Sequence, residues 1–354
     1  MNLISLKHAL AIAAFVAGTS VTPVMANGLL VSNNGMVQMG VNDDGSLDAT
    51  TTAGYVGLGY NFSGQGGRSG FQDALSPGCP CEAWGVASAD SPGSSTGIGA
   101  QVGQSTGNSG IGVANSSAGT NTNAIDAGPT ATFTSNTSLT ALSGLTITQV
   151  FSHSAETATG ALFQDAITIH NGTGAAINNL EYTRAMDWDA PPTEFSEFTT
   201  FKGTTTTSEL IRSTDNGFSS GNPLIAASDP GIIGPINADG ISGPTDHGSL
   251  FTFLLGALAD GADHTFNIFY GAGANGTDAL SLLSAISPEL YTLGQSTNNA
   301  GGPAIDLPTF IFAFNGVGGE IVVPPEPQGV PEPASVALLG LGLLGLGMLR
   351  RRKI

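Results

Sequence analysis

The clearest strand signal in this chain is the stretch LEYTRAMDW at residues 180–188. In a β-strand every second side chain lies on the same face, so alternating apolar residues mark a strand with one buried side. Four large apolar residues of this stretch share one face: Leu180, Tyr182, Met186 and Trp188. We therefore expect a strand here, with its apolar face turned towards the core of a β-sheet protein.

The same alternation recurs on both sides of this stretch. It predicts further strands over residues 145–151, 161–170, 250–255, 263–270 and 309–314. Residues 171–174 (Asn-Gly-Thr-Gly) supply turn chemistry between two of the strands. Residues 278–286 instead carry apolar residues at helical spacing with Pro288 beyond them, which predicts one short helix. Together these signals predict a mainly β fold, an antiparallel β-sandwich ectodomain with that helix.

The ectodomain divides by composition into two regions. Residues 27–128 form a β region rich in glycine, serine and asparagine, and residues 129–320 carry the strong strand signals of the sandwich. Within the first region, residues 91–127 are nearly all small or polar. Two interpretations are open for them, short strands packed on the second region or a long flexible insertion, and we favour the strands.

Composition narrows the class of protein. The chain has 354 residues, of which 51 are glycine and 10% are charged, and its formal net charge is −18. Because phosphate binding needs clustered lysine and arginine, this acidity argues against a nucleic-acid partner. A hydrophobic content of 40% argues against wholesale disorder.

The first 26 residues have the three parts of a secretory signal. Lys7 lies in a weakly basic start, residues 9–21 are mostly apolar, and small residues precede a cleavage point between Ala26 and Asn27. We expect a signal helix at residues 1–26 and an exported mature chain.

The C-terminal region begins with a proline-rich linker at residues 321–333. Residues 334–349 follow without a charge, and as a helix they would span roughly 24 Å, which is short of the ~30 Å hydrocarbon core. A basic cluster then ends the chain: Arg350, Arg351, Arg352 and Lys353. Basic residues favour the cytoplasmic side, so we expect a marginal transmembrane helix with its C-terminus inside.

These parts resemble a known sorting signal. Its recognition segment is carried by Val330, Pro331, Glu332 and Pro333. With the leucine- and glycine-rich helix and the basic cluster, residues 330–354 are similar to the PEP-CTERM sorting signal, a region that is also labelled an ice-binding protein C-terminal domain. The resemblance implies processing by exosortase and delivery to the envelope or extracellular matrix of an exopolysaccharide-producing Gram-negative bacterium. It implies transient or stable membrane anchoring. It thus indicates where the protein is delivered and says nothing about an activity.

The ectodomain itself resembles, over about residues 140–315, a type that accompanies PEP-CTERM signals. The resemblance is carried by residues 184–188, 215–218, 246–248 and 269–272. It implies no assigned activity and supports only the fold.

Two groups of carboxylates are candidate Ca²⁺ sites; the sequence establishes no cofactor, and Ca²⁺ is the one that these patterns suggest. Between residues 27 and 333, which separate the two terminal segments, four basic residues oppose 27 acidic ones, a formal charge of −23. Asp187 and Asp189 flank Trp188, so on a strand their carboxylates point the same way. The other group surrounds a glycine turn without the terminal Glu of an EF-hand: Asp43, Asp44 and Asp48. The alternative for Asp187 and Asp189 is capping of the strand end. The alternative for the second group is a solvated acidic turn.

Cys79 and Cys81 are the only cysteines. Export favours oxidation, although cysteines two residues apart form a disulfide only with strain. Three states stay open: an intraloop disulfide, which we favour, two free thiols, or part of a metal site that needs outside ligands.

The sequence contains no HExxH motif, and the histidines of the mature domain are scattered and single, so no set of catalytic residues stands out from spacing. We therefore expect a non-catalytic protein with a structural or adhesive role at the cell surface or in exopolysaccharide. One alternative is a glycan-binding or glycan-active domain in which Asp187 and Asp189 act beside Trp188. It requires Trp188 to be exposed, whereas the alternation places Trp188 on the inner face. A second alternative, ice binding by threonine rows at residues 130–140 and 204–207, lacks the regular spacing that a lattice demands.

Overall fold

The computed structural model describes residues 28–51, 54–105, 108–109, 113–118, 125–127, 132–225 and 237–322. The signal helix predicted at residues 1–26 and the sorting signal at residues 330–354 lie outside these ranges, as does most of the linker at residues 321–333. Within the described ranges, no helix is both long and apolar enough to span a membrane.

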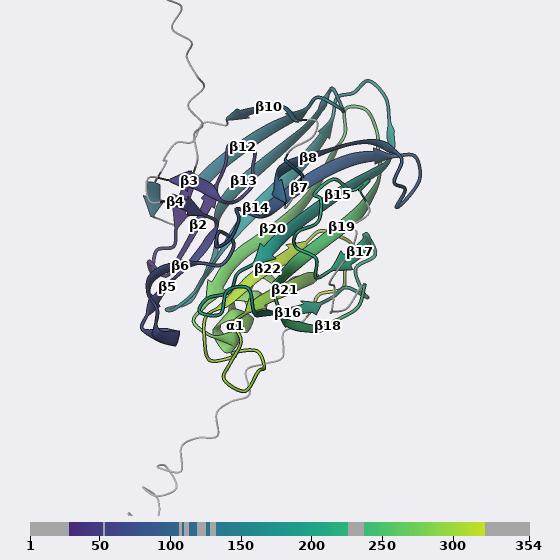
Figure 1. The fold of residues 1–354 in the computed structure, drawn as a ribbon. Coiled ribbons are helices and arrows are strands. Elements are labelled where there is room, and N and C mark those ends of the chain that lie inside the picture. Colours follow the sequence, from purple (N-terminus) through teal and green to yellow (C-terminus); the bar gives the residue numbers. More distant parts are fainter. Residues whose placement is uncertain are drawn as a thin grey trace, which may run out of the picture.

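The strand expected at residues 180–188 is part of β15, which lies inside a six-stranded sheet (Figure 1). The order of this sheet is β17 (Leu210–Thr214), β19 (His247–Leu258), β15 (Ile177–Trp188), β7 (Glu82–Ala89), β8 (Gly97–Ser105) and β9 (Asn108–Ser109). β15 pairs antiparallel with β19 on one side and with β7 on the other. A strand from the glycine-rich region is therefore the direct neighbour of the strand that carries the strongest signal.

A nine-stranded sheet forms the second large layer. Its order is β10 (Val113–Ala118), β12 (Thr132–Leu139), β13 (Leu145–Glu156), β14 (Ala161–Asn171), β20 (Asp263–Gly273), β22 (Thr309–Asn315), β21 (Leu290–Gln295), β16 (Glu197–Lys202) and β18 (Gly240–Thr245). All its pairings are antiparallel. The predicted mainly β, antiparallel fold is confirmed.

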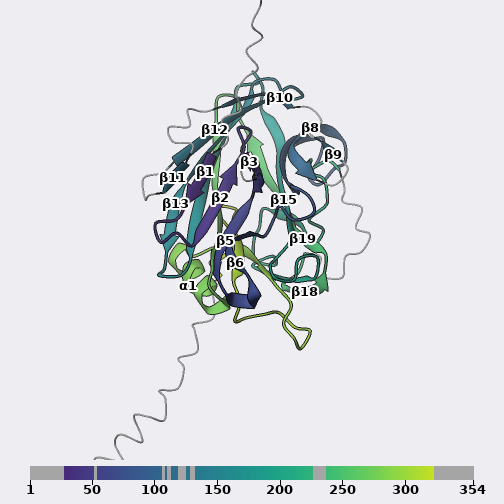
Figure 2. The same cartoon turned by 60° about the vertical axis from the view of Figure 1, so that its left-hand side comes forward.

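A five-stranded sheet from the N-terminal part packs on β14 and β20 of the large sheet (Figure 2). Its order is β11 (Ile125–Ala127), β1 (Gly28–Val31), β2 (Val37–Val41), β5 (Leu58–Ser63) and β6 (Ser69–Asp73). The pairing of β1 with β11 is parallel. A short 3₁₀ turn, η1 (Gln65–Gly67), joins β5 to β6, and β3 (Ala49–Thr51) pairs with β4 (Gly54–Val56).

The core between the two large sheets is aromatic. Phe251 of β19 lies against Phe312 and Phe314 of β22, with ring centroids 5.7 and 5.3 Å apart. Tyr182 of β15 meets Phe266 of β20 edge to face at 4.9 Å. Such pairs add to the stabilisation from apolar burial, so they fix how the two sheets stack.

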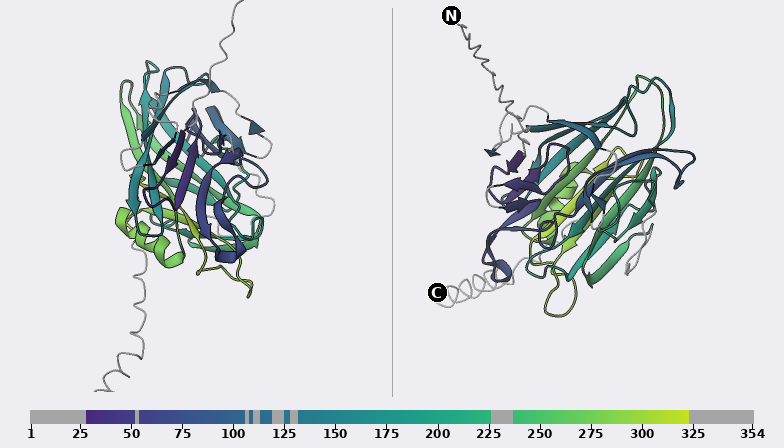
Figure 3. Two further views of the ribbon diagram at one scale, coloured as in Figure 1. Left: turned by 90° about the vertical axis from the view of Figure 1, so that its left-hand side faces the viewer. Right: turned by 45° about the horizontal axis from the view of Figure 1, so that its top comes forward.

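The predicted helix is confirmed as α1 (Gly276–Ile286), on the outer side of the nine-stranded sheet (Figure 3). Asn275 caps its N-terminus by accepting a hydrogen bond from the backbone N–H of Asp278, and Ser287 ends it in a left-handed conformation. Leu282 and Leu283 are buried in a second, smaller core with Phe269. Both faces of the large sheet are therefore covered near the helix.

Arg184 lies on the buried face of β15 together with the apolar residues. The alternating pattern alone did not predict a charged side chain on this face. It is fully buried, and its guanidinium is ion-paired with Glu82 of β7 and lies 3.8 Å from Asp165 of β14. Its Nη1 also donates to Gln149 at 3.0 Å. Burial raises the pKa of Asp165 to about 8, although Arg184 opposes that shift. A buried charge is tolerated only with such partners, so these side chains link the two sheets.

Candidate metal centre

Asp187 near the end of β15 and Asp189, the first residue after it, place two carboxylates side by side, as predicted from their spacing. The backbone N–H of Asp187 donates to the Cys81 carbonyl at 3.0 Å, and that of Asp189 donates to the Ala74 carbonyl at 2.8 Å. These bonds tie the strand end to two segments of the N-terminal region. The side chains of Asp187 and Asp189 are therefore held by a fixed backbone.

A third carboxylate comes from a distant part of the chain. Asp246 is the single residue between β18 of the nine-stranded sheet and β19 of the six-stranded sheet. Carboxylate oxygens of Asp187, Asp189 and Asp246 all lie within 4.8 Å of one another. Asp187 and Asp189 are 2% and 0% exposed, whereas Asp246 is exposed, so the cluster opens to solvent on the Asp246 side.

The oxygens of this cluster lack donors. Oδ1 of Asp187 and both carboxylate oxygens of Asp189 are shielded from solvent and have no hydrogen-bond partner in the part of the chain that the structure describes. A buried acceptor without a donor costs roughly 1–3 kcal/mol, and more when it is charged. Such oxygens are suited to binding a cation.

The electrostatics of the site also favour the binding of a cation. Burial, followed by the charges of Asp189 and Asp246, raises the pKa of Asp187 well above its ordinary value. Burial, followed by Glu197 and Asp246, raises the pKa of Asp189 to about 8. Of the nearby carboxylates, Glu194 is paired with Arg68 at 2.9 Å. A divalent cation would relieve both the desolvation and the repulsion.

The spacing of the oxygens suits Ca²⁺. Calcium is bound by oxygen ligands at about 2.3–2.6 Å, so ligands on opposite sides of the ion are about 4.6–5.2 Å apart. The three carboxylates meet that limit without rearrangement. They would supply up to six oxygens, within the 6–8 that Ca²⁺ takes.

The second predicted calcium group is not assembled. Oδ1 of Asp44 accepts hydrogen bonds from the backbone and the hydroxyl of Ser46, at 3.0 and 2.6 Å, and closes its own turn. Asp48 lies elsewhere and accepts from the Ser76 hydroxyl at 2.7 Å. Asp43, Asp44 and Asp48 do not form a group with metal-ligand spacing within the described ranges.

Cys79 and Cys81 are joined by a disulfide, which is the first of the three states considered. Their sulfur atoms lie within 4.8 Å of a carboxylate oxygen of Asp187. The disulfide therefore packs beside the carboxylate cluster, and in this state its sulfurs are not thiolate ligands.

A Ser-His-Glu arrangement lies next to the cluster. Ser242 Oγ is 2.7 Å from His247 Nε2, and His247 Nδ1 is 3.7 Å from Glu197 Oε1. That glutamate oxygen instead accepts the backbone N–H of His247 at 2.9 Å. Because Ser242 is only 4% exposed, its hydroxyl does not reach a polymeric substrate in this conformation.

Trp188 and the threonine run at residues 204–207 do not present the surfaces that the two alternative functions require of them. Trp188 is fully buried, with Nε1 donating to Ser249 Oγ at 3.2 Å, so it cannot stack on a sugar. The hydroxyls of Thr204 and Thr207 are used within a turn, where they bond Asp239 and the Gly203 carbonyl at 2.9 and 2.8 Å. This threonine run is not a flat exposed row.

Asp246 and Glu197 are the residues that sequence reasoning missed. Asp246 belonged to one of the segments that carried the ectodomain resemblance, yet no spacing linked it to Asp187, from which it is separated by 59 positions in the sequence. Only a pairing signal between β15 and β19, in which Trp188 faces His247, would have placed Asp246 beside the strand end.

The comparisons with known proteins match one segment of the chain. Residues 329–353 match the family model described as the PEP-CTERM protein-sorting motif. No curated protein and no solved structure matches the chain. The chain thus carries a PEP-CTERM sorting motif, as the resemblance at Val330–Pro333 indicated, and the motif implies export, envelope association and processing by exosortase. The ice-binding label and the ectodomain resemblance gain no support.

Proposed function

We propose that this chain is a non-catalytic structural or adhesive protein of the Gram-negative cell surface or exopolysaccharide matrix, with an ectodomain that binds Ca²⁺. The observation that carries the proposal is the cluster of Asp187, Asp189 and Asp246, whose buried oxygens lack donors. The sorting motif supports delivery to a compartment where calcium is plentiful. Extracellular calcium modules commonly have Kd values of about 10⁻⁴–10⁻³ M.

Bound Ca²⁺ would act first on the fold. Asp187 and Asp189 end a strand of the six-stranded sheet, and Asp246 lies where the chain passes from the nine-stranded sheet to β19. One ion would therefore tie both large sheets together at one end of the sandwich. Because the ion binds the folded state, it stabilises that state by mass action.

An adhesive role fits the charge of the ectodomain. The formal charge of −23 between the terminal segments leaves many exposed carboxylates with few basic neighbours. Divalent cations at such carboxylates also coordinate anionic groups of a matrix polymer, which gives a calcium-dependent contact. The helix predicted from sequence at residues 334–349 would hold the ectodomain at the membrane, transiently if exosortase processing removes it and stably if it is retained.

The non-catalytic assignment rests on access. The aromatic side chain beside the acidic pair is buried, and the Ser242 hydroxyl is buried too. A glycoside hydrolase needs its two carboxyl groups to contact the scissile bond. Asp187 and Asp189 are shielded, and their geometry suits a small ion better than a sugar chain.

Two experiments test the proposal. In the native host, replacing residues 350–353 with glutamine should disturb retention and C-terminal processing, and unchanged fractionation and processing would contradict the sorting assignment. For the purified full chain, 10 mM CaCl₂ should raise the unfolding midpoint above that in EDTA, and 10 mM MgCl₂ should raise it less. Equal midpoints in CaCl₂ and EDTA would refute the calcium assignment.

A further inference from the structure

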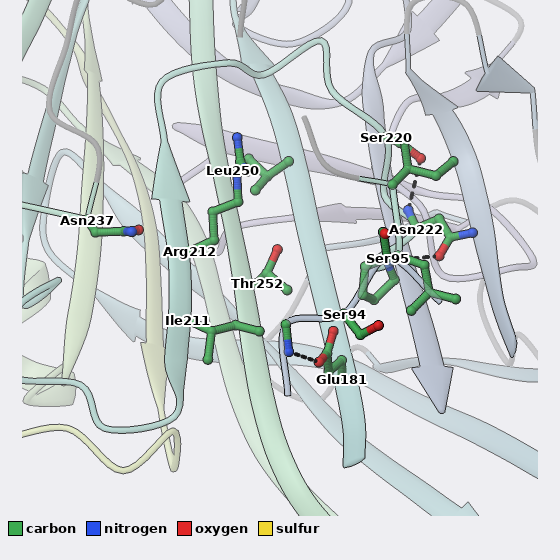
Figure 4. A pocket seen from close by; sticks show the side chains of 14 residues that line it. Ser94, Ser95, Glu181, Ile211, Arg212, Ser220, Asn222, Asn237, Leu250 and Thr252 are labelled. Atoms are coloured by element: carbon green, nitrogen blue, oxygen red, sulfur yellow. Dashed lines mark hydrogen bonds between the residues drawn. The ribbon is translucent and has the colours of Figure 1, made fainter. Parts of the chain in front are cut away.

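A second concave site lies on the six-stranded sheet, apart from the carboxylate cluster (Figure 4). It has a volume of about 240 Å³, and its lining includes Glu181 of β15, Arg212 of β17 and Thr252 of β19. The opposite face of β15, on which Tyr182 lies, is the one that packs in the core. Glu181 is six residues from Asp187, about 20 Å along the strand, so the pocket and the metal centre are separate sites.

Glu181 gives this pocket a buried carboxylate. It is fully buried, and its Oε1 accepts the backbone N–H of Gly93 at 2.7 Å, which holds the loop between β7 and β8 over the strand. Its Oε2 is shielded from solvent and has no hydrogen-bond partner among the residues that the structure describes. Burial raises the pKa of Glu181, and the bond from Gly93 partly offsets that shift. A hydroxyl donor from a ligand would satisfy this oxygen.

The opposite wall is preorganised by a loop. The Ser220 hydroxyl donates to Gln101 at 2.6 Å, and the backbone N–H of Asn222 donates to the Ser220 oxygen at 3.1 Å. Asn222 Oδ1 in turn accepts the backbone N–H of Leu224 at 3.1 Å. These bonds fix the side chain of Asn222 at the pocket wall, where it lies near Ser95 (Figure 4).

The lining combines donors, acceptors and apolar surface. Arg212 is a cationic donor, Asn222 and Ser94 are neutral polar groups, and Leu224 and Leu250 add an apolar part. The volume lies below the roughly 300–1,000 Å³ of drug-sized sites, so one small ring fills it. A sugar ring offers hydroxyl donors and acceptors around its edge and C–H groups on its faces, which matches this lining.

We infer that this pocket binds one neutral sugar residue of a glycan. A ligand without net charge is favoured because the opposite charges of Glu181 and Arg212 leave the pocket with little net preference for an anion or a cation, while the charge of −23 between the terminal segments repels anions. None of the described lining residues is aromatic, so we expect no contribution from stacking and a Kd in the millimolar range. This site is independent of calcium binding at Asp187, and it gives the ectodomain a direct contact with a matrix glycan.

The test is saturation-transfer NMR on the full chain in a sugar-free detergent. D-glucose, D-galactose and N-acetyl-D-glucosamine are the neutral probes, with D-glucuronate and L-alanine as the charged comparators. We expect transfer to at least one neutral sugar with a millimolar Kd. Absence of transfer to all three neutral sugars, or tighter binding of glucuronate or alanine, overturns the proposal.

Variants locate the binding. Ser95→Trp adds bulk at the pocket lining and should weaken binding at least fivefold, whereas Ser69→Trp, on the exposed strand β6, should leave it unchanged. Glu181→Gln keeps an acceptor for Gly93 and removes the charge, so it should also weaken binding while the fold is retained. Binding that is equal in the wild type, Ser95→Trp and Glu181→Gln overturns the assignment to this pocket.

Discussion

Asp189→Asn tests whether the carboxylate cluster binds Ca²⁺, because the substitution should change stability in opposite directions with and without the ion. The wild-type carboxylate is fully buried and has no donor to either oxygen among the described residues, and its neighbours Glu197 and Asp246 raise its pKa. Without a cation, removing this charge should stabilise the fold. A buried asparagine side chain is neutral, so folding neither removes water from a charge nor brings that charge close to the neighbouring carboxylates. In Ca²⁺ the same substitution should remove a ligand. One variant is therefore expected to be more stable than the wild type in EDTA and to gain less from calcium.

The magnitude follows from proton linkage. The pKa of Asp189 is about 8 in the folded state, against ~3.9 in the unfolded chain. Between these values the folded state binds more protons, so its stability falls as pH rises, by ~1.4 kcal/mol per pH unit for one carboxylate. From pH 6 to pH 8 the wild type should lose about 2–3 kcal/mol relative to Asp189→Asn in EDTA.

Calcium should reverse this order of stability. At 10 to 100 times its Kd, Ca²⁺ stabilises the wild type by about 1.4–2.7 kcal/mol, which corresponds to a rise in Tm of about 2–4 °C for a domain of this size. The assay is thermal unfolding followed by circular dichroism at pH 6 and pH 8, in EDTA and in 10 mM CaCl₂. Asp306→Asn, at an exposed position, is the matched control and should behave as the wild type does.

Two results would refute the reasoning. If Asp189→Asn were less stable than the wild type in EDTA at pH 8, the Asp189 carboxylate would have a favourable interaction in the folded state, contrary to its oxygens that lack a hydrogen-bond partner among the described residues. If the variant gained as much from Ca²⁺ as the wild type, calcium would bind elsewhere.

Three further predictions concern the site and the core. Ca²⁺ affinity measured by isothermal titration calorimetry should rise from pH 6 to pH 8, because the raised pKa of Asp189 means that a proton must leave before calcium binds; constant affinity would contradict this. Arg184→Met should leave Glu82 buried without its partner and cost ~3–5 kcal/mol in urea unfolding, and a loss below ~1 kcal/mol would show that the ion pair is dispensable. Leu282→Ala should lower the free energy of unfolding by ~2–5 kcal/mol in the same assay, whereas the exposed control Ser281→Ala should change it by less than ~0.5 kcal/mol. Equal effects of the two substitutions would show that α1 does not pack on the sheet.

Local patterns were sufficient for the elements of the fold. Helix α1 and six strands lie where the helical spacing or the alternation placed them: β13, β14, β15, β19, β20 and β22. The pattern works because side-chain direction in a strand or a helix depends only on position along that element. The same rule placed Asp187 and Asp189 on one side of β15 and Trp188 on the other.

The candidate site was predictable only in part. Asp187 and Asp189 are neighbours in sequence, but Asp246 joins them because β19 pairs with β15 and because a single residue connects β18 to β19. Local sequence patterns did not predict the burial of Arg184 either, because a charged side chain is typical of an exposed position. Its burial depends on Glu82 and Asp165, which two other strands bring to it.

By itself, the sequence determined which segments form strands and the helix, the acidity of the chain and the presence of the sorting motif, because each depends on local residue patterns or on composition. Only the tertiary structure decided which carboxylates meet, that Trp188 is buried and that Glu181 lines a pocket with Arg212. These properties depend on strand order and register, which bring residues far apart in the chain within contact distance. Chemistry at a site requires that distance, and no local pattern encodes it.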